Sequence, residues 1–135
     1  MLIDTSVLIA AARPRERLHE VAAEALRDAE GGPLGVPVSI LSETMSLLGA
    51  RAGVEQQRRF WDGFMVSGIE LIAFDAELLE VAREIDARYK DVAFGFADCT
   101  LLAACERGRC ARVLSFDRRL AAYRPTFAPA LHVSP

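Results

Sequence analysis

The sequence predicts an α/β protein with three layers, αβα, around a central, mostly parallel sheet. Short apolar runs of the β type alternate with longer segments in which apolar residues recur at helical spacing. Strands that alternate with helices usually form a parallel sheet covered on both faces. The chain has 135 residues, 52% of them hydrophobic and 26% charged. This composition is typical of a globular protein, and the length suits one domain over residues 1–135 with a substantial core.

The expected strands are short apolar runs bounded by turn or helix-capping residues. The second run contains Gly35 and Pro37, which weaken strand pairing, but a strand remains the best interpretation. The last run is expected to be an edge strand. The predicted strands cover residues 1–3, 34–38, 69–74, 113–116 and 131–133.

The expected helices begin at capping residues and carry apolar stripes. Asp4, Ser39 and Asp75 are placed to cap three of them. The helix after Asp75 should bury Leu78, Leu79, Ala82 and Ile85, and the helix over 95–107 should bury Leu101, Leu102 and Cys105. We expect Phe60, Trp61 and Phe64 to lie in the core or in a dimer interface. Predicted helices begin after Asp4 and Asp75 and cover 19–30, 39–50, 54–66 and 95–107, with a short helical stretch at 117–123.

Charge, cysteine content and hydropathy exclude several classes of protein. A formal net charge of −3 argues against nucleic-acid binding by bulk positive charge. The three cysteines form no CxxC pair, so neither a disulfide framework nor a zinc knuckle is expected. The longest apolar run, residues 7–12, is far shorter than the ~20 residues of a membrane span, and no signal peptide is evident. We therefore expect a cytoplasmic protein without membrane contact.

Four acidic residues occupy positions that the predicted topology brings together. Asp4 and Asp117 each follow a strand, Glu43 lies one turn into the helix after the second strand, and Asp98 opens a helix. The carboxyl ends of parallel strands share one edge, where ligand sites form. Clustered carboxylates repel one another unless a cation lies among them, and hard oxygen ligands suit Mg²⁺ or Mn²⁺. The pattern therefore favours a divalent-metal site.

Helix capping is the alternative explanation for three of these acids. Asp4, Asp98 and Asp117 occupy positions where a cap carboxylate is favoured by ~1 kcal/mol without any catalytic role. Glu43 lies inside its helix and does not fit that explanation. Each acid alone is compatible with a structural role, whereas the four together favour metal chemistry.

Four segments resemble, in order, the motifs of PIN-domain nucleases. Residues 2–9 (LIDTSVLI) resemble the opening motif, and 39–43 (SILSE) the second acid. Residues 98–104 (DCTLLAA) are similar to the third motif, and 113–117 (VLSFD) to the fourth. The resemblance covers nearly the whole chain, and the length suits the VapC-type toxins of bacterial toxin–antitoxin pairs.

This resemblance implies a metal-dependent endoribonuclease. Asp4, Glu43, Asp98 and Asp117 would be the catalytic residues and would hold one or two Mg²⁺ or Mn²⁺ ions. The hydroxyls of Thr5, Ser6 and Ser115 would orient carboxylates or waters. The resemblance also implies a homodimer and a cognate, VapB-like antitoxin that blocks the cleft.

The chain departs from many relatives just after the fourth motif. Where they carry a further acid, this chain has Arg118 and Arg119, so a fully ligated second metal is not expected. The formal charge of −3 becomes +1 when the four candidate ligands are left out, and 15 of the 16 basic residues are Arg. Arginine suits bidentate phosphate contacts. We expect Arg13, Arg15, Arg118 and Arg119 to rim the cleft and contact RNA.

Two other functions remain open from the sequence. One is an RNA-processing nuclease of the same chemistry without an antitoxin. The other is a catalytically inert α/β interaction module whose acids only cap helices. No short motif in the sequence identifies the RNA substrate, because proteins recognise RNA largely by its shape and by its single-stranded loops.

Overall fold

All strands of the computed structural model, which describes residues 1–135, run parallel in a single sheet. The order across the sheet is β3-β2-β1-β4-β5, so the first strand lies at the centre. Each strand falls within or overlaps one of the runs predicted from the sequence, and the predicted fold class is confirmed. The strands are β1 (Leu2–Ile3), β2 (Gly35–Pro37), β3 (Glu70–Ile72), β4 (Arg112–Leu114) and β5 (His132–Ser134).

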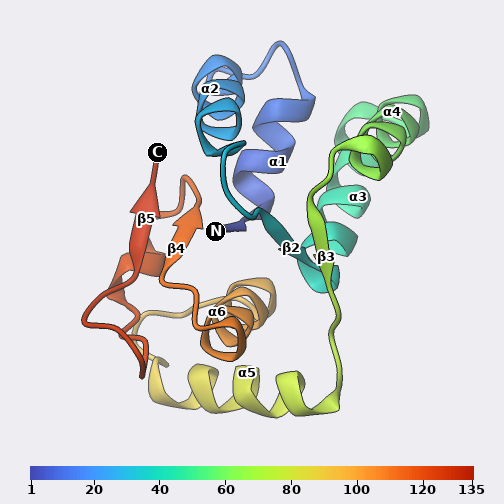
Figure 1. The fold of residues 1–135 in the computed structure, drawn as a ribbon. Coiled ribbons are helices and arrows are strands. Elements are labelled where there is room, and N and C mark those ends of the chain that lie inside the picture. Colours follow the sequence, from blue (N-terminus) through green and yellow to red (C-terminus); the bar gives the residue numbers. More distant parts are fainter.

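Helices cover the sheet from both sides (Figure 1). Helices α1 and α2 lie on one side, and α5 and α6 lie on the other, while α3 and α4 pack together beside β2 and β3. A 3₁₀ helix follows β4 and leads toward β5. The helices are α1 (Thr5–Ala12), α2 (His19–Ala29), α3 (Val38–Ala52), α4 (Val54–Val66), α5 (Ala76–Arg88), α6 (Phe96–Gly108) and the 3₁₀ helix η1 (Arg118–Ala122).

Two details of the helices differ from the sequence prediction. Helix α3 begins at Val38 with Pro37 as its N-cap, so Ser39 lies inside the first turn and does not cap it. The Ser39 hydroxyl instead lies 2.7 Å from that of Thr100 on α6. Leu79 on α5 is 45% exposed, because the buried stripe follows Leu78, Ala82 and Ile85, at spacings of four and three residues.

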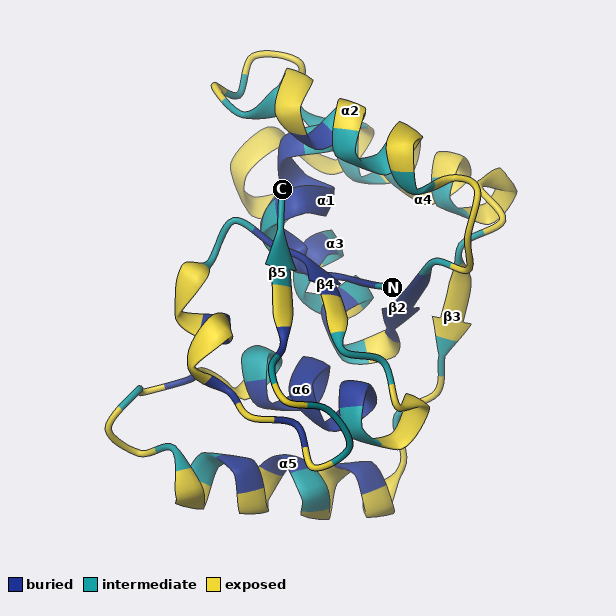
Figure 2. Ribbon diagram, turned by 60° about the vertical axis from the view of Figure 1, so that its left-hand side comes forward, coloured by how far each residue is buried: buried dark blue, intermediate teal, exposed yellow.

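The core lies between the sheet and the helices that cover it (Figure 2). Helix α6 is buried from Cys99 to Cys105, which confirms the inward placement of Leu101, Leu102 and Cys105. Helix α4 has no fully buried residue: Phe60 and Phe64 pack against the edge of the core, and Trp61 is 56% exposed. No helix has the length and apolarity needed to cross a membrane.

The parallel arrangement determines where polar groups gather. Because all five strands point the same way, the segments that follow β1, β2 and β4 emerge at one edge of the sheet. Asp4 follows β1 directly, and its backbone N–H donates to the carbonyl of Leu114 at the end of β4 (2.9 Å). The first and fourth motifs therefore meet at this edge.

Candidate functional site

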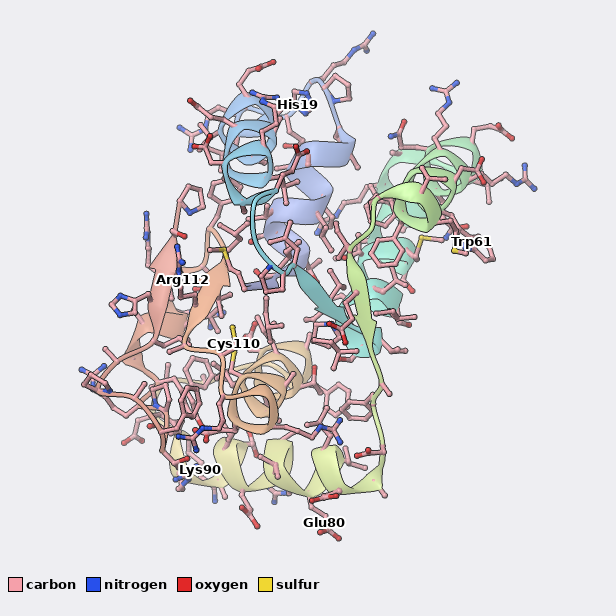
Figure 3. All side chains as sticks on the ribbon, in the orientation of Figure 1. His19, Trp61, Glu80, Lys90, Cys110 and Arg112 are labelled. Carbon is pink, nitrogen blue, oxygen red and sulfur yellow. The ribbon has the colours of Figure 1, made fainter.

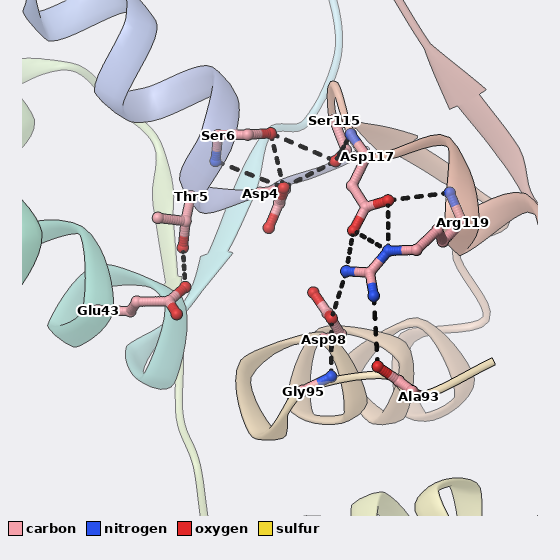
Figure 4. A network of polar contacts seen from close by, with 10 residues as sticks. All are labelled: Asp4, Thr5, Ser6, Glu43, Ala93, Gly95, Asp98, Ser115, Asp117 and Arg119. Carbon is pink, nitrogen blue, oxygen red and sulfur yellow. Dashed lines mark hydrogen bonds and ion pairs between the residues drawn. The ribbon is translucent and has the colours of Figure 1, made fainter. Parts of the chain in front are cut away.

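Asp4 is the buried centre of the polar network at the carboxyl edge of the sheet (Figure 4). It is the N-cap of α1 and is 6% exposed. The hydroxyls of Ser6 and Ser115 both donate to its Oδ2, each at 2.7 Å, and the Ser6 backbone N–H lies 3.4 Å from the same oxygen. All three donors converge on one carboxylate oxygen. Oδ1 accepts no hydrogen bond from the protein.

Ser6 and Ser115 connect Asp4 to the backbone that follows β4. The Ser6 hydroxyl oxygen accepts from the backbone N–H of Phe116 (3.0 Å) and the Ser115 hydroxyl oxygen accepts from that of Asp117 (3.0 Å). Each serine hydroxyl thus accepts a hydrogen bond from the backbone of the fourth motif and donates one to Asp4. This arrangement fixes the orientation of the Asp4 carboxylate.

Glu43 faces the site from α3. Its Oε2 accepts a hydrogen bond from the Thr5 hydroxyl at 2.5 Å, and its Oε1 has no protein donor. Thr5 is the first residue of α1 and is buried, so it links the first motif to the second across 38 residues of sequence. Thr5, Ser6 and Ser115 therefore each hold a carboxylate in place.

Asp98 approaches from the first turn of α6. Its Oδ2 accepts from the backbone N–H of Gly95 (2.9 Å), which completes a capping box at the N-terminus of the helix. Burial raises the pKa of Asp98, and the neighbouring Asp4 and Asp117 carboxylates raise it further, while the Gly95 N–H and Arg119 act in the opposite direction. Asp98 therefore combines partial burial with two acidic neighbours, and both disfavour its charged form.

Asp117 is held by an arginine two residues further along the chain. The Arg119 Nε donates to both Asp117 oxygens at 3.0 Å, and its Nη2 donates to Oδ2 at 2.5 Å. The Arg119 backbone N–H also donates to Oδ1 at 2.9 Å. The hydrogen bonds from Arg119 keep the pKa of Asp117 below its ordinary value. The Nη2 atom also lies 3.5 Å from Oδ2 of Asp98, so the guanidinium bridges two of the four acids.

A hollow of about 400 Å³ lies between α3 and the start of α6. Glu43 and Asp98 line it, together with residues that the sequence interpretation did not assign to the site. Phe96 is 64% exposed at its rim. The small polar residues of α3 recur at spacings of three and four, a pattern that could have revealed a polar helix face in the sequence. The hollow is lined by Ser39, Ser42, Glu43, Ser46, Gly95, Phe96, Ala97 and Asp98.

The donor set suits a hard divalent cation. Asp4, Glu43 and Asp98 each use one carboxylate oxygen in hydrogen bonds or ion pairs and leave the other without a protein donor. No three acidic, histidine or cysteine side chains are close enough to hold one ion together. Mg²⁺ retains several waters and binds proteins through one or two carboxylates. Two of these carboxylates, with waters that bridge to the third, therefore suit Mg²⁺. The residues present fit the ion that the sequence predicts.

The other arginines predicted to rim the cleft do not contact these acids. Arg13 is the C-cap of α1, at the far end of the helix from Asp4, and it pairs with Glu16 at 2.5 Å. Arg15 is exposed in the loop that follows. Arg118 donates to the carbonyls of Val133 and Pro135 beside β5. Among the four predicted arginines, Arg119 alone reaches the carboxylates.

The sequence also matches a known family. The family model of the PIN domain matches residues 1–124, most of the chain. The chain is a PIN-domain protein. No curated protein sequence matches this PIN-domain protein significantly.

Solved structures share the fold of this PIN-domain protein at low sequence identity. VapC20 of Mycobacterium tuberculosis, a toxin that cleaves the sarcin–ricin loop, matches with a TM-score of 0.83 and 21% identity, over 95% of this chain and 98% of that one. FitAcB of Neisseria gonorrhoeae matches with a TM-score of 0.71 and 15% identity, over 99% of this chain and 96% of that one. VapBC2 of Rickettsia felis, bound to promoter DNA, matches with a TM-score of 0.64 and 16% identity, over 84% of each chain. These similarities establish the fold.

Proposed function

We propose that this chain is a metal-dependent endoribonuclease and the toxin of a VapBC-like toxin–antitoxin pair. The observation that carries the proposal is the set of Asp4, Glu43 and Asp98 carboxylates at one edge of a PIN-domain sheet, each with an oxygen free of protein donors. Asp117, held by Arg119, is the fourth acid at this edge. The similarity in fold to VapC20 and VapBC2 supports the toxin role.

Two of the Asp4, Glu43 and Asp98 carboxylates would hold Mg²⁺ or Mn²⁺ through their free oxygens, and waters would bridge the ion to the third. A bound ion would lower the pKa of a water nucleophile and stabilise the charge that develops on the phosphodiester. Asp4 contributes a carboxylate that Ser6 and Ser115 prevent from rotating. Such supporting hydrogen bonds tune a metal site and commonly change its affinity or activity by about 10–100-fold.

We also propose that Glu43 and Asp98 have distinct tasks at the hollow. Thr5 holds Glu43 in one orientation, with its free oxygen available. Asp98 has a raised pKa in the absence of a cation, because burial and its acidic neighbours disfavour its charge. A cation there would offset the repulsion between Asp98 and its acidic neighbours.

RNA and an antitoxin are the partners we propose. VapC20 cleaves the sarcin–ricin loop, so an RNA that contains this loop is the first substrate to test. A similar fold also occurs in a toxin–antitoxin complex from Klebsiella pneumoniae, which supports a VapB-like antitoxin as the protein partner. The three free cysteines and an RNA substrate agree with action in the cytoplasm.

A homodimer is a further part of the proposal. Helix α4 exposes Val54, Trp61 and Met65, which recur at spacings of seven and four and so lie on one face of the helix. Figure 3 shows Trp61 at the outer side of α4, away from the sheet. Exposed apolar side chains grouped in this way suit a subunit interface.

The test is incubation of the purified protein with total RNA, with and without Mg²⁺ or Mn²⁺, followed by mapping of new 5′ ends. Discrete ends that require metal and vanish in Asp4→Asn support the proposal. Asp75→Asn is the matched control, because Asp75 also caps a helix but pairs with Arg107 away from the site. RNA that stays intact with both ions would favour an inert interaction module.

A further inference from the structure

Arg119 is the only cationic side chain that forms an ion pair with any of the four acids. Its guanidinium lies between Asp98 and Asp117, one carboxylate on each side (Figure 4). If all four acids served as metal ligands, a second divalent ion would need the Asp117 carboxylate, which Arg119 already holds. The position of Arg119 therefore bears on how many ions the site can hold.

Several contacts hold the guanidinium there. Three of its hydrogen bonds go to the Asp117 carboxylate, and Nη1 donates to the carbonyl of Ala93 at 3.3 Å. Ala93 has a φ of 57°, a left-handed backbone that a residue with a Cβ rarely adopts. Arg119 is thus anchored by a side chain on one face and by a turn carbonyl on another.

The carboxylate oxygens divide into two groups. Asp4, Glu43 and Asp98 each retain an oxygen without a protein donor, whereas both oxygens of Asp117 are occupied by Arg119. An ion can reach the first three acids without breaking a charged pair. An ion at Asp117 must first displace a guanidinium bound through several charge-assisted hydrogen bonds, which are among the strongest in proteins.

We propose that Arg119 is a positioning residue that serves as the second cation of this site. It neutralises Asp117 and shares the charge of Asp98, so the chain binds one divalent ion rather than two, through a pair of free carboxylate oxygens among Asp4, Glu43 and Asp98. The inference rests on the proposed metal-dependent function. It assigns Asp117 a role that acts through Arg119 rather than through a metal.

The test is to titrate the metal-free protein with Mn²⁺ and to monitor binding by calorimetry and by electron paramagnetic resonance. Wild type should bind one Mn²⁺ per chain with the spectrum of an isolated ion. Arg119→Ala and Arg119→Gln should bind a second Mn²⁺, and the spectrum should broaden because the two ions are close. The first ion should bind about tenfold more tightly, because the competing cation is gone. Arg119→Lys should keep one ion, since the charge remains.

Two further variants separate the effect of Arg119 from a general change in charge. Arg118→Ala removes the same charge from the adjacent residue, whose guanidinium contacts only carbonyls beside β5, and it should keep the wild-type stoichiometry. Asp117→Asn combined with Arg119→Ala should also bind one ion, because the second site loses its carboxylate.

The results distinguish failure of this inference from failure of the proposed function. If Arg119→Ala and Arg119→Gln bind Mn²⁺ with the stoichiometry and affinity of wild type, Arg119 is not the second cation, although the metal site stands. Two ions bound to wild type would also overturn the inference alone. If neither wild type nor any Arg119 variant binds Mn²⁺, the metal-dependent function itself is wrong and the inference falls with it.

Discussion

The hydrogen bonds of Asp4 predict different stabilities for two substitutions that both remove its charge. Asp4→Asn keeps an oxygen that can accept from Ser6 and Ser115, and it places the amide NH₂ where Oδ1 has no protein donor. Asp4→Ala removes the acceptor of both hydroxyls and the N-cap of α1. Both variants should lose cleavage, by at least about 100-fold for a metal-binding carboxylate.

The expected magnitudes follow from the individual contacts. A buried donor left without a partner costs about 1–3 kcal/mol, and the loss of an N-cap costs about 1 kcal/mol. The Ser6 and Ser115 hydroxyls lie 3.3 Å apart and can partly satisfy each other, so one donor at most is orphaned. Asp4→Ala should therefore lose about 2–4 kcal/mol of unfolding free energy, or roughly 10 °C in Tm.

Asp4→Asn should change the unfolding free energy by less than about 1 kcal/mol. Its neutral oxygen accepts weaker hydrogen bonds, but the loss of charge relieves the desolvation of a buried carboxylate and its repulsion of Asp98. Urea unfolding of the metal-free proteins, followed by circular dichroism, measures both values. Equal stability of the alanine and asparagine variants would refute the role given to the serine hydroxyls, and full cleavage by either would refute the role of Asp4.

Three more predictions concern contacts elsewhere. Thr5→Val keeps the shape of the side chain but removes the hydrogen bond to Glu43, so the affinity for Mn²⁺ should fall about tenfold. Thr5→Ser keeps the hydroxyl and should bind Mn²⁺ as tightly as wild type; calorimetry measures both affinities. Burial raises the pKa of Glu106, but hydrogen bonds from Thr126 and Tyr123 outweigh burial and leave the pKa below its ordinary value. The charge of Glu106 therefore stabilises the fold above its unfolded-state pKa, and this contribution is lost as the pH falls through the folded-state pKa. Glu106→Gln should lower the unfolding free energy by about 1 kcal/mol at pH 7 and by almost nothing near pH 2. Urea unfolding at both pH values measures the difference. Trp61→Ser should shift the protein from dimer to monomer in sedimentation analysis, and an unchanged mass would contradict an interface on α4.

Much of the fold could be predicted from local patterns. Alternation of apolar runs and helical spacing located all five strands, and Asp75 was correctly predicted to cap α5 through the N–H of Leu78. These features depend on residues a few positions apart, so periodicity and capping chemistry report them directly. The start of α3 was misjudged, because Pro37 served as its N-cap and no side chain marked the boundary.

The candidate site was predictable only as a set of residues at one edge. Parallel topology placed Asp4 and Asp117 after adjacent strands, β1 and β4, and this follows from the order of elements alone. The partner of each carboxylate did not follow from the sequence. Arg119 was expected at the RNA-binding rim, yet its guanidinium lies on Asp117 and Asp98.

The sequence by itself determined the fold class, the order of the strands along the chain and the acids that follow them. Only the tertiary structure decided which carboxylate oxygens are occupied and which remain free. The physical reason is that a side chain's rotamer and partners depend on groups brought close in space, such as Ser115 and Asp4, which are 111 residues apart in the chain but joined by a 2.7 Å hydrogen bond.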